Sequence, residues 1–226
     1  MNDFISLESK RAEMFKLLSV FLCEPEEEVL INGELFTSFE RLFNQLTASE
    51  EAIADKLAAE SKKHTITELK VEYTRLFIGP FITLASPYSS LYFGEKTLMG
   101  DTTVRVRKFY EEAGLEFDKS VNETPDHAVI ETEFLYYLIH NEIEALQNKD
   151  NKLAKELNAK QSEFLKTHYL LWIPKMCGLV VENTKIEYFK ILFNYFISYL
   201  EKDYVPELKF DTYNELPRSK ADEVSK

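Results

Sequence analysis

The sequence predicts an all-α fold, a single-chain helical bundle, from three observations. Its 226 residues include only six glycines and seven prolines, and so few helix breakers favour long helices over a many-turned β protein. Apolar residues recur at helical spacing along most of the chain, whereas no stretch alternates convincingly at period two. Apolar residues make up 45% of the chain and charged residues 29%, the balance of a globular protein with a buried core.

The length of the chain fits one domain, because 226 residues are enough to bury a substantial core. We predict a single all-helical domain over 1–226, divided into an N-terminal lobe over 1–115 and a C-terminal lobe over 116–202. Charged residues follow Asp203 and are interrupted by two prolines, so residues 203–226 are predicted to form an extended or loosely docked tail.

Three helices are predicted in the first quarter of the chain. Ser6–Cys23 carries apolar residues at helical spacing, and Glu24-Pro25 ends it because proline disfavours helical geometry in the residue before it. Gly33–Leu46 and Ser49–Ser61 have the same periodicity and are the next two helices.

A fourth helix is predicted to start at Thr65-Ile-Thr-Glu68, which has the form of a capping box, and to end at Gly79-Pro80. Residues 79–100 then form the most loop-like interior stretch of the chain. They are rich in aromatic and apolar side chains, which must pack against something. Asp101 is the predicted cap of the next helix, which stops at Gly114.

The C-terminal half predicts three more helices, which run from about Pro125 to Asn148, from about Asn151 to Leu171, and from Thr184 to about Lys202. Trp172-Ile-Pro174 is expected to interrupt the chain, and Thr184-Lys-Ile-Glu187 to form a second capping box. The last helix is apolar nearly all round apart from a narrow polar stripe. Its apolar run is too short and too broken to cross a membrane, so we expect a central buried helix.

The net charge and the cysteines limit the cellular compartment of the protein and the kinds of partner that it can bind. A formal net charge of −12 repels nucleic acid and anionic membranes and favours basic partners, although it also serves solubility alone. Cys23 and Cys177 stand in apolar surroundings and are predicted to be buried thiols in a reducing compartment. The N-terminal residues lack the apolar run of a signal peptide. We expect a cytoplasmic protein without a nucleic-acid partner and without stable membrane insertion.

The segment from Asn122 to Leu135, N-E-T-P-D-H-A-V-I-E-T-E-F-L, gathers acids around one histidine. Helix capping explains part of it, with Thr124 as N-cap, Pro125 as the first helical residue and Asp126 in the first turn. Capping does not explain His127, nor the carboxylates of Glu131 and Glu133 beside an apolar run.

A catalytic interpretation of this segment uses His127 and Glu131, which lie four residues apart on one helix face. It makes the chain a helical, metal-dependent hydrolase. The sequence contains no H-E-x-x-H, G-x-S-x-G, P-loop or G-x-G-x-x-G motif. We therefore predict no metal, no cofactor and no catalytic residue, and keep the hydrolase as the alternative.

A third interpretation is recognition of a partner. Carboxylates at a helix start, next to an aromatic-rich loop, suit a ligand that is basic at one end and apolar at the other. Arginine is the natural counterpart of a carboxylate because it forms bidentate hydrogen bonds.

Four segments in the same order resemble the TorD/DmsD/NarJ family of cytoplasmic chaperones for molybdenum-containing oxidoreductases. Glu123-Thr-Pro-Asp-His127, followed by E-T-E-F-L, resembles the family's E-x-P-D-H signature. Tyr73–Phe77 with Gly79-Pro80, and Ser86–Tyr92, are similar to its Y-x-x-L-F-x-G-P and P-Y-x-S-x-Y segments, and Leu17–Pro25 resembles the end of its first helix. The resemblance runs from about residue 12 to about residue 145, and Thr132 between two glutamates is a small departure from the pattern.

The resemblance implies a TorD-like helical bundle with a chaperone function. Such a chaperone binds the twin-arginine leader and the apo-form of a molybdoenzyme catalytic subunit, assists cofactor insertion and delays export. The leader-binding residues that we predict combine an acidic rim with aromatic side chains: Glu123, Asp126, His127, Glu131, Tyr88, Tyr92 and Phe93.

For each of these residues a structural role competes with the functional one, namely capping, core packing or a solvated loop charge. Carboxylates beside His127 would raise its pKa and make it sensitive to pH near neutrality. Arg75 is predicted to pair internally with an acid such as Glu131. A structural subunit of a larger complex, a guanine-nucleotide switch, a homodimer, direct contact with the molybdenum cofactor and the identity of the client all stay open.

Overall fold

The computed structural model of the chain describes residues 2–31, 33–79, 83–96, 98–116 and 123–201. Every regular element within these ranges is a helix, and a single isolated antiparallel bridge joins Tyr88 to His127. The all-α prediction is confirmed. The predicted tail over 203–226 lies outside the described residues.

Helical elements follow one another along the whole described chain. The first eight are α1 (Asn2–Phe21), α2 (Glu27–Ile31), α3 (Glu34–Thr47), α4 (Ile53–Ser61), α5 (Ile66–Tyr73), the π-helical turn η1 (Thr74–Ile78), α6 (Ser89–Tyr92) and α7 (Asp101–Glu112). The remaining five are α8 (Ala128–Gln147), α9 (Asn151–Phe164), the π-helical turn η2 (Leu165–Tyr169), α10 (Leu170–Asn183) and α11 (Glu187–Tyr199).

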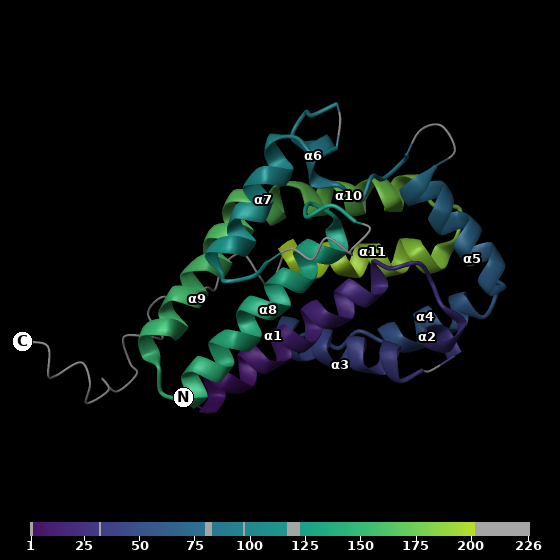
Figure 1. The fold of residues 1–226 in the computed structure, drawn as a ribbon. Coiled ribbons are helices and arrows are strands. Elements are labelled where there is room, and N and C mark those ends of the chain that lie inside the picture. Colours follow the sequence, from purple (N-terminus) through teal and green to yellow (C-terminus); the bar gives the residue numbers. More distant parts are fainter. Residues whose placement is uncertain (1, 32, 80–82, 97, 117–122, 202–226) are drawn as a thin grey trace, which may run out of the picture.

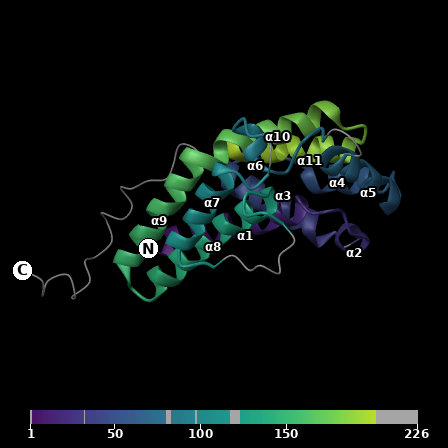
Figure 2. The ribbon, with the colours of Figure 1, turned by 45° about the horizontal axis from the view of Figure 1, so that its top comes forward.

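The helices form an elongated bundle along α1. Helix α1 packs along α8, and α8 in turn packs against α9. Figures 1 and 2 show α7, α8 and α9 at one end of the molecule, and α3, α4 and α5 at the other end beside the pair α10–α11. Because α1 also contacts α3, it runs through both ends and joins them.

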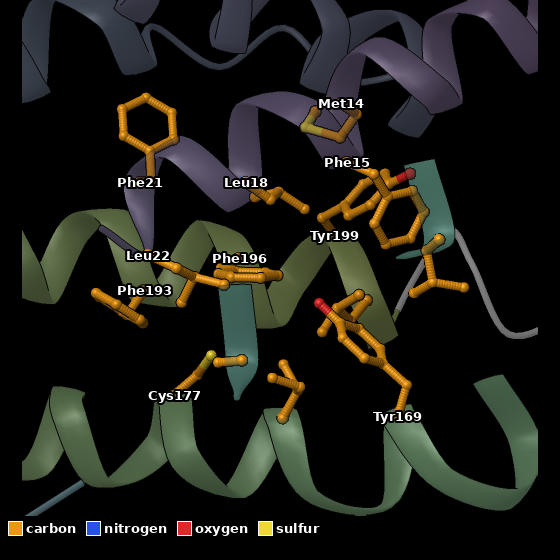
Figure 3. Packing of buried hydrophobic residues seen from close by; sticks show 14 of the residues in the cluster. Met14, Phe15, Leu18, Phe21, Leu22, Tyr169, Cys177, Phe193, Phe196 and Tyr199 are labelled. Atoms are coloured by element: carbon orange, nitrogen blue, oxygen red, sulfur yellow. The ribbon is translucent and has the colours of Figure 1, made fainter. Parts of the chain in front are cut away.

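The core lies where α1 meets α11 and α10 (Figure 3). Phe15 of α1 has no exposed surface, and its ring meets the ring of Tyr169 edge-on at 6.3 Å and that of Tyr199 at 6.2 Å. Leu18 and Phe196 fill the same region and are also buried. Edge-on aromatic pairs contribute about 0.5–1.5 kcal/mol beyond their area burial, so this contact fixes α1 on the C-terminal helices.

Helix α11 is the buried helix that the sequence predicts. Its apolar faces lie in the core, while Lys190 and Asn194 of the predicted polar stripe are exposed. None of the described helices is both long enough and apolar enough to span a bilayer.

The interruption predicted at Trp172–Pro174 is wrong, because Pro174 lies inside the continuous helix α10. Proline within a helix costs about 3 kcal/mol. Trp172, Ile173 and Met176 around it have no exposed surface, and burying their side chains outweighs that cost.

The capping box predicted at Thr184–Glu187 is also wrong, whereas the one at Thr65–Glu68 is confirmed. Helix α11 starts at Glu187 with Ile186 as its N-cap, and Thr184, two residues earlier, donates its hydroxyl to Glu72 Oε1 at 3.0 Å. Arg75 donates to both oxygens of Glu72 at 2.7 and 2.8 Å. Burial raises the pKa of Glu72, but the Arg75 hydrogen bonds and the other donors outweigh burial and lower it. The internal pairing predicted for Arg75 is thus correct, with Glu72 as the partner in place of Glu131.

Two further local predictions, the cap at Asp101 and the burial of Cys23, are wrong. Asp101 is the first residue of α7 rather than its cap, and Glu95 Oε1 accepts the backbone N–H of Thr102 at 2.7 Å. Cys177 is buried as predicted, but Cys23 is exposed because α1 ends two residues before it.

A buried polar cluster joins α1, α8 and α9. Glu142 has no exposed surface, and its oxygens accept hydrogen bonds from Asn158 Nδ2 at 3.2 Å and from Gln161 Nε2. Arg11 pairs with Glu8 and donates to Gln161 Oε1 at 3.4 Å. Burial, with the Glu8 carboxylate nearby, raises the pKa of Glu142 to about 8.

Replacing Glu142 by glutamine is expected to stabilise the protein at high pH. A carboxyl group with a folded pKa near 8 and an unfolded pKa of about 4.3 binds its proton more tightly in the folded state. Its contribution to stability is full below the unfolded value and is lost as pH rises through the folded value. Glu142→Gln removes this loss, which amounts to roughly 1.4 kcal/mol for each unit of pKa displacement.

Urea unfolding between about pH 5 and about pH 9 measures this effect, as a stability that falls with pH in the wild type and stays flatter in the variant. Glu144→Gln is the matched control, because the Glu144 side chain is 58% exposed on the same helix. An E142Q protein that keeps the wild-type pH profile would show that Glu142 ionises without cost.

Candidate functional site

The site begins at the turn that precedes α8. Thr124 O accepts the backbone N–H of His127 at 3.1 Å, so residues 124–127 form a turn outside the helix. His127 is the N-cap, with an extended backbone and with Nδ1 accepting the N–H of Val129 at 3.2 Å. The predicted N-cap at Thr124 and the predicted helix start at Pro125 are therefore wrong, because the turn moves the helix start to Ala128.

Asp126 holds this turn against α6 and α7. Its side chain is fully buried, and Oδ1 accepts the hydroxyls of Thr124 at 2.7 Å and Thr103 at 3.0 Å. Its Oδ2 accepts the backbone N–H of Ser90 at 3.2 Å, and its backbone oxygen accepts the N–H of Ser89 at 3.0 Å. Asp126 is thus a positioning residue in this structure, with no surface that a ligand can reach.

Glu131 holds α8 against η2 and α10 in the same way. It has no exposed surface, and its two oxygens bond to His168 Nε2 and Trp172 Nε1, each at 2.8 Å. Burial raises the pKa of Glu131, and the contacts with His168 and Trp172 partly oppose that rise. The ring of Phe93 stacks on His168 at 5.2 Å, and that of Tyr92 lies 5.4 Å from Trp172. Tyr92 and Phe93 therefore cover this buried pair.

Three of the predicted site residues line an open hollow of about 370 Å³, namely Tyr88, Glu123 and His127. The Tyr88 hydroxyl donates to Glu123 Oε2 at 2.7 Å, and its ring meets His127 edge-on at 5.1 Å. Asp126, Glu131, Tyr92 and Phe93 do not line the hollow. The signature segment, residues 123–135, therefore has some of its polar side chains in the interior and others at the surface of the hollow.

The hollow has a mixed apolar and polar lining that includes one lysine and one glutamate. Its other lining residues come from α5, η1, the loop after η1, and the segment around α6: Tyr73, Phe77, Ile78, Thr83, Ser86, Pro87, Leu91, Lys96 and Leu98. Ile78 is 60% exposed, Leu91 41% and Leu98 42%. Large apolar side chains that stay in water beside a hollow are typical of binding surfaces.

Sequence patterns did not single out Ile78, Leu91 and Leu98. Ile78 stands at the end of the fourth predicted helix and Leu91 and Leu98 stand in the predicted loop over 79–100, and only the fold shows that these three side chains stay outside. Tyr73 and Phe77 are both buried, and both also line the hollow.

The environment of His127 lowers its pKa, contrary to the predicted rise. Burial is the largest cause and favours the neutral imidazole. The carboxylates of Glu123 and Asp126 act in the opposite direction without overcoming burial. His127 is therefore a neutral hydrogen-bonding group near pH 7, and its Nδ1 is occupied by the cap.

The structure pairs Glu131 with His168 and not with His127, the partner that the hydrolase interpretation requires. Among the residues that the structure describes, no group of three or more His, Cys, Asp or Glu side chains is arranged to hold a metal ion.

Comparison with known proteins finds a family model and relatives that agree with one another. The model of the nitrate reductase delta subunit family matches residues 40–178. A chaperone protein TorD of Photobacterium profundum is 26% identical over 211 residues, covering 90% of this chain and 96% of that protein. The Tat proofreading chaperone DmsD of Salmonella typhi is 37% identical over 78 residues, 34% of this chain and 38% of that protein.

One solved structure shares the fold. The crystal structure of a candidate redox enzyme maturation protein from Archaeoglobus fulgidus aligns with a TM-score of 0.54 at 24% identity, covering 84% of this chain and 94% of that chain. Fold and relatives together define a helical chaperone. The chain belongs to the nitrate reductase delta subunit family, the TorD-like chaperone family that its motifs resemble.

Replacing Asp126 by asparagine is expected to destabilise the fold by about 1.5–3 kcal/mol, since an amide nitrogen would face a donor that now bonds to a carboxylate oxygen. Urea unfolding measures the change. Glu123→Gln is the control, because Glu123 is exposed and its amide oxygen can still accept the Tyr88 hydroxyl. Equal stabilities of D126N and wild type would refute the structural role of the Asp126 carboxylate.

Proposed function

We propose that the chain is a cytoplasmic chaperone, without a catalytic step of its own, for a molybdenum-containing oxidoreductase. It binds the twin-arginine leader and the apo-form of this client, assists insertion of the cofactor and delays export until insertion is complete. Membership of the family supports the chaperone role, and the hollow beside Tyr88 and His127 supports the leader as the ligand.

The single observation that carries this proposal is the chemistry of the hollow. A twin-arginine leader has a basic segment followed by an apolar one. The hollow offers exposed apolar side chains at Ile78, Leu91 and Leu98 and a carboxylate at Glu123 on its edge. Burying an apolar segment there contributes roughly 25 cal/mol for each Å² removed from water, and the carboxylate favours a neighbouring cation.

The predicted site residues take two roles in this proposal. Tyr88, Glu123 and His127 lie in the lining and contact the leader. Asp126 and Glu131 act as positioning residues, because their oxygens are occupied by hydrogen bonds within the protein. Tyr92, the last residue of α6, and Phe93, which follows it, support the α6 segment by packing against Trp172 and His168.

The walls of the hollow suit reversible binding. Tyr73, Phe77, Ile78 and Leu91 lie in helical elements, and the Asp126 contacts hold the α6 segment, so this part of the lining is preformed for a ligand. A hollow of this size buries a modest area, and an affinity in the micromolar range, about −8 kcal/mol, is expected. Such an affinity allows the chaperone to release its client.

Calorimetry with a synthetic twin-arginine leader tests the proposal. Replacing both Leu91 and Leu98 by serine is expected to weaken binding roughly tenfold, because the apolar segment loses contact area in the hollow. Leu153→Ser is the matched control, since Leu153 is 43% exposed on α9 and does not line the hollow. No measurable heat with either the leader or its Lys-Lys variant would rule out leader binding.

A further inference from the structure

A second hollow of about 240 Å³ opens where α1 ends, between the start of α2 and the start of α11. Its walls are largely apolar and include Phe21, Leu30 and Phe189. Cys23, Glu24 and Glu26 complete the side that follows α1. Glu24 lies at the end of the family-like segment Leu17–Pro25, whereas Glu26 lies outside all four such segments.

Tyr73 links the first hollow, which it lines, to the chain segment that borders the second. The ring of Tyr73 lines the first hollow, and its hydroxyl donates to the backbone oxygen of Leu22 at 3.0 Å. The chain neighbours of Leu22, Phe21 and Cys23, line the second hollow. Burial raises the pKa of Tyr73, and charges on both sides add to it, from Glu24 on one side and from the first hollow on the other. The hydroxyl end of Tyr73 therefore stands between the two openings.

The second hollow is the more negative of the two. Glu24 and Glu26 line it without any lysine or arginine, whereas Lys96 shares the first hollow with Glu123. Helix α1 points its carbonyl end at this place and has no basic residue in its last turn, so the helix dipole adds negative potential.

Two groups near the opening complete its charge environment. Burial is the main cause of the raised pKa of the Cys23 thiol. The second cause is the negative charge of Glu133, an exposed residue on α8, so this carboxylate lies near the opening. Lys70 Nζ lies 3.6 Å from Glu24 Oε1, and both side chains are about half exposed. This ion pair is therefore weak, and a basic ligand can replace Lys70 as the partner of Glu24.

We infer that the second hollow receives the basic segment of the same peptide whose apolar segment lies in the first hollow, with the peptide crossing over Tyr73. Charge complementarity supports this occupant, as does the Tyr73–Leu22 contact that brings the second hollow close to the first. The inference rests on the proposed leader binding and deepens it, because it fixes the direction of the peptide. The arginines lie at the α1–α2 junction, and the apolar segment lies toward α6.

Neutralising the acidic edge tests the assignment. The variant Glu24→Gln/Glu26→Gln is expected to bind the full leader roughly three- to tenfold more weakly, with a smaller salt dependence, as for the loss of two exposed ion pairs. It should bind a peptide that contains only the apolar segment as the wild type does. Glu27→Gln/Glu28→Gln is the control, since these adjacent exposed acids remove the same charge but do not line the hollow.

Cys23 supplies an independent footprint in the unmodified protein. It lines the second hollow and is exposed, whereas Cys177 is buried, so iodoacetamide is expected to alkylate Cys23 selectively. The full leader at saturating concentration should slow this alkylation roughly fivefold or more, and the apolar peptide alone should not. Mass spectrometry of the intact chain and its fragments gives the rate.

The outcomes separate the two claims. Failure of the full leader to bind the wild type removes the proposed function and this inference with it. Three results would each overturn the second subsite and leave the first hollow as the leader site. They are normal binding by E24Q/E26Q, equally weakened binding by E27Q/E28Q, and leader binding that does not protect Cys23. Circular dichroism of each variant confirms that the helices are intact.

Discussion

The buried carboxylate of Asp126 is the constraint on which the arrangement of the site depends. A carboxylate without exposed surface must receive its hydrogen bonds from the protein, and here the donors are Ser90, Thr103 and Thr124. They belong to α6, α7 and the turn before α8, so one side chain fixes three segments that are distant in sequence. The first hollow lies against this junction, because its lining residues Tyr88 and His127 are close neighbours of the segments that Asp126 holds.

The acidic residues of the signature segment are close in sequence but lie in different environments. Asp126 and Glu131 are sealed inside and stabilise the packing of α8 against its neighbours, while Glu123 is exposed and faces the hollow. A motif of this kind describes a scaffold and a contact surface together. Substitution of a buried member acts on the shape of the hollow, and substitution of an exposed member acts on its charge.

Helix α1 connects this scaffold to the rest of the molecule. Along its length it packs against α8 and contributes Phe15 to the core, and just beyond its end the backbone oxygen of Leu22 accepts a hydrogen bond from Tyr73 of α5. A ligand that spans both hollows would therefore touch the α1 terminus, α5 and the α6 segment at once. Such contacts couple the bound peptide to the principal packing interface of the bundle.

The sequence alone determined the helical class, the family resemblance and those starts that depend on neighbouring residues, such as the capping box at Thr65–Glu68. The helical class and the capping box follow from interactions between residues three or four positions apart, and the resemblance follows from short motifs in a fixed order, so local sequence is enough for all three. Only the tertiary structure decided that Pro174 stays inside a helix, that Thr184 bonds to Glu72 instead of capping, and that Cys23 is exposed. It also separated buried Asp126 from the residues that line the hollow. In each case the deciding energy comes from burial and from partners brought together by the fold, and neither is encoded in local spacing.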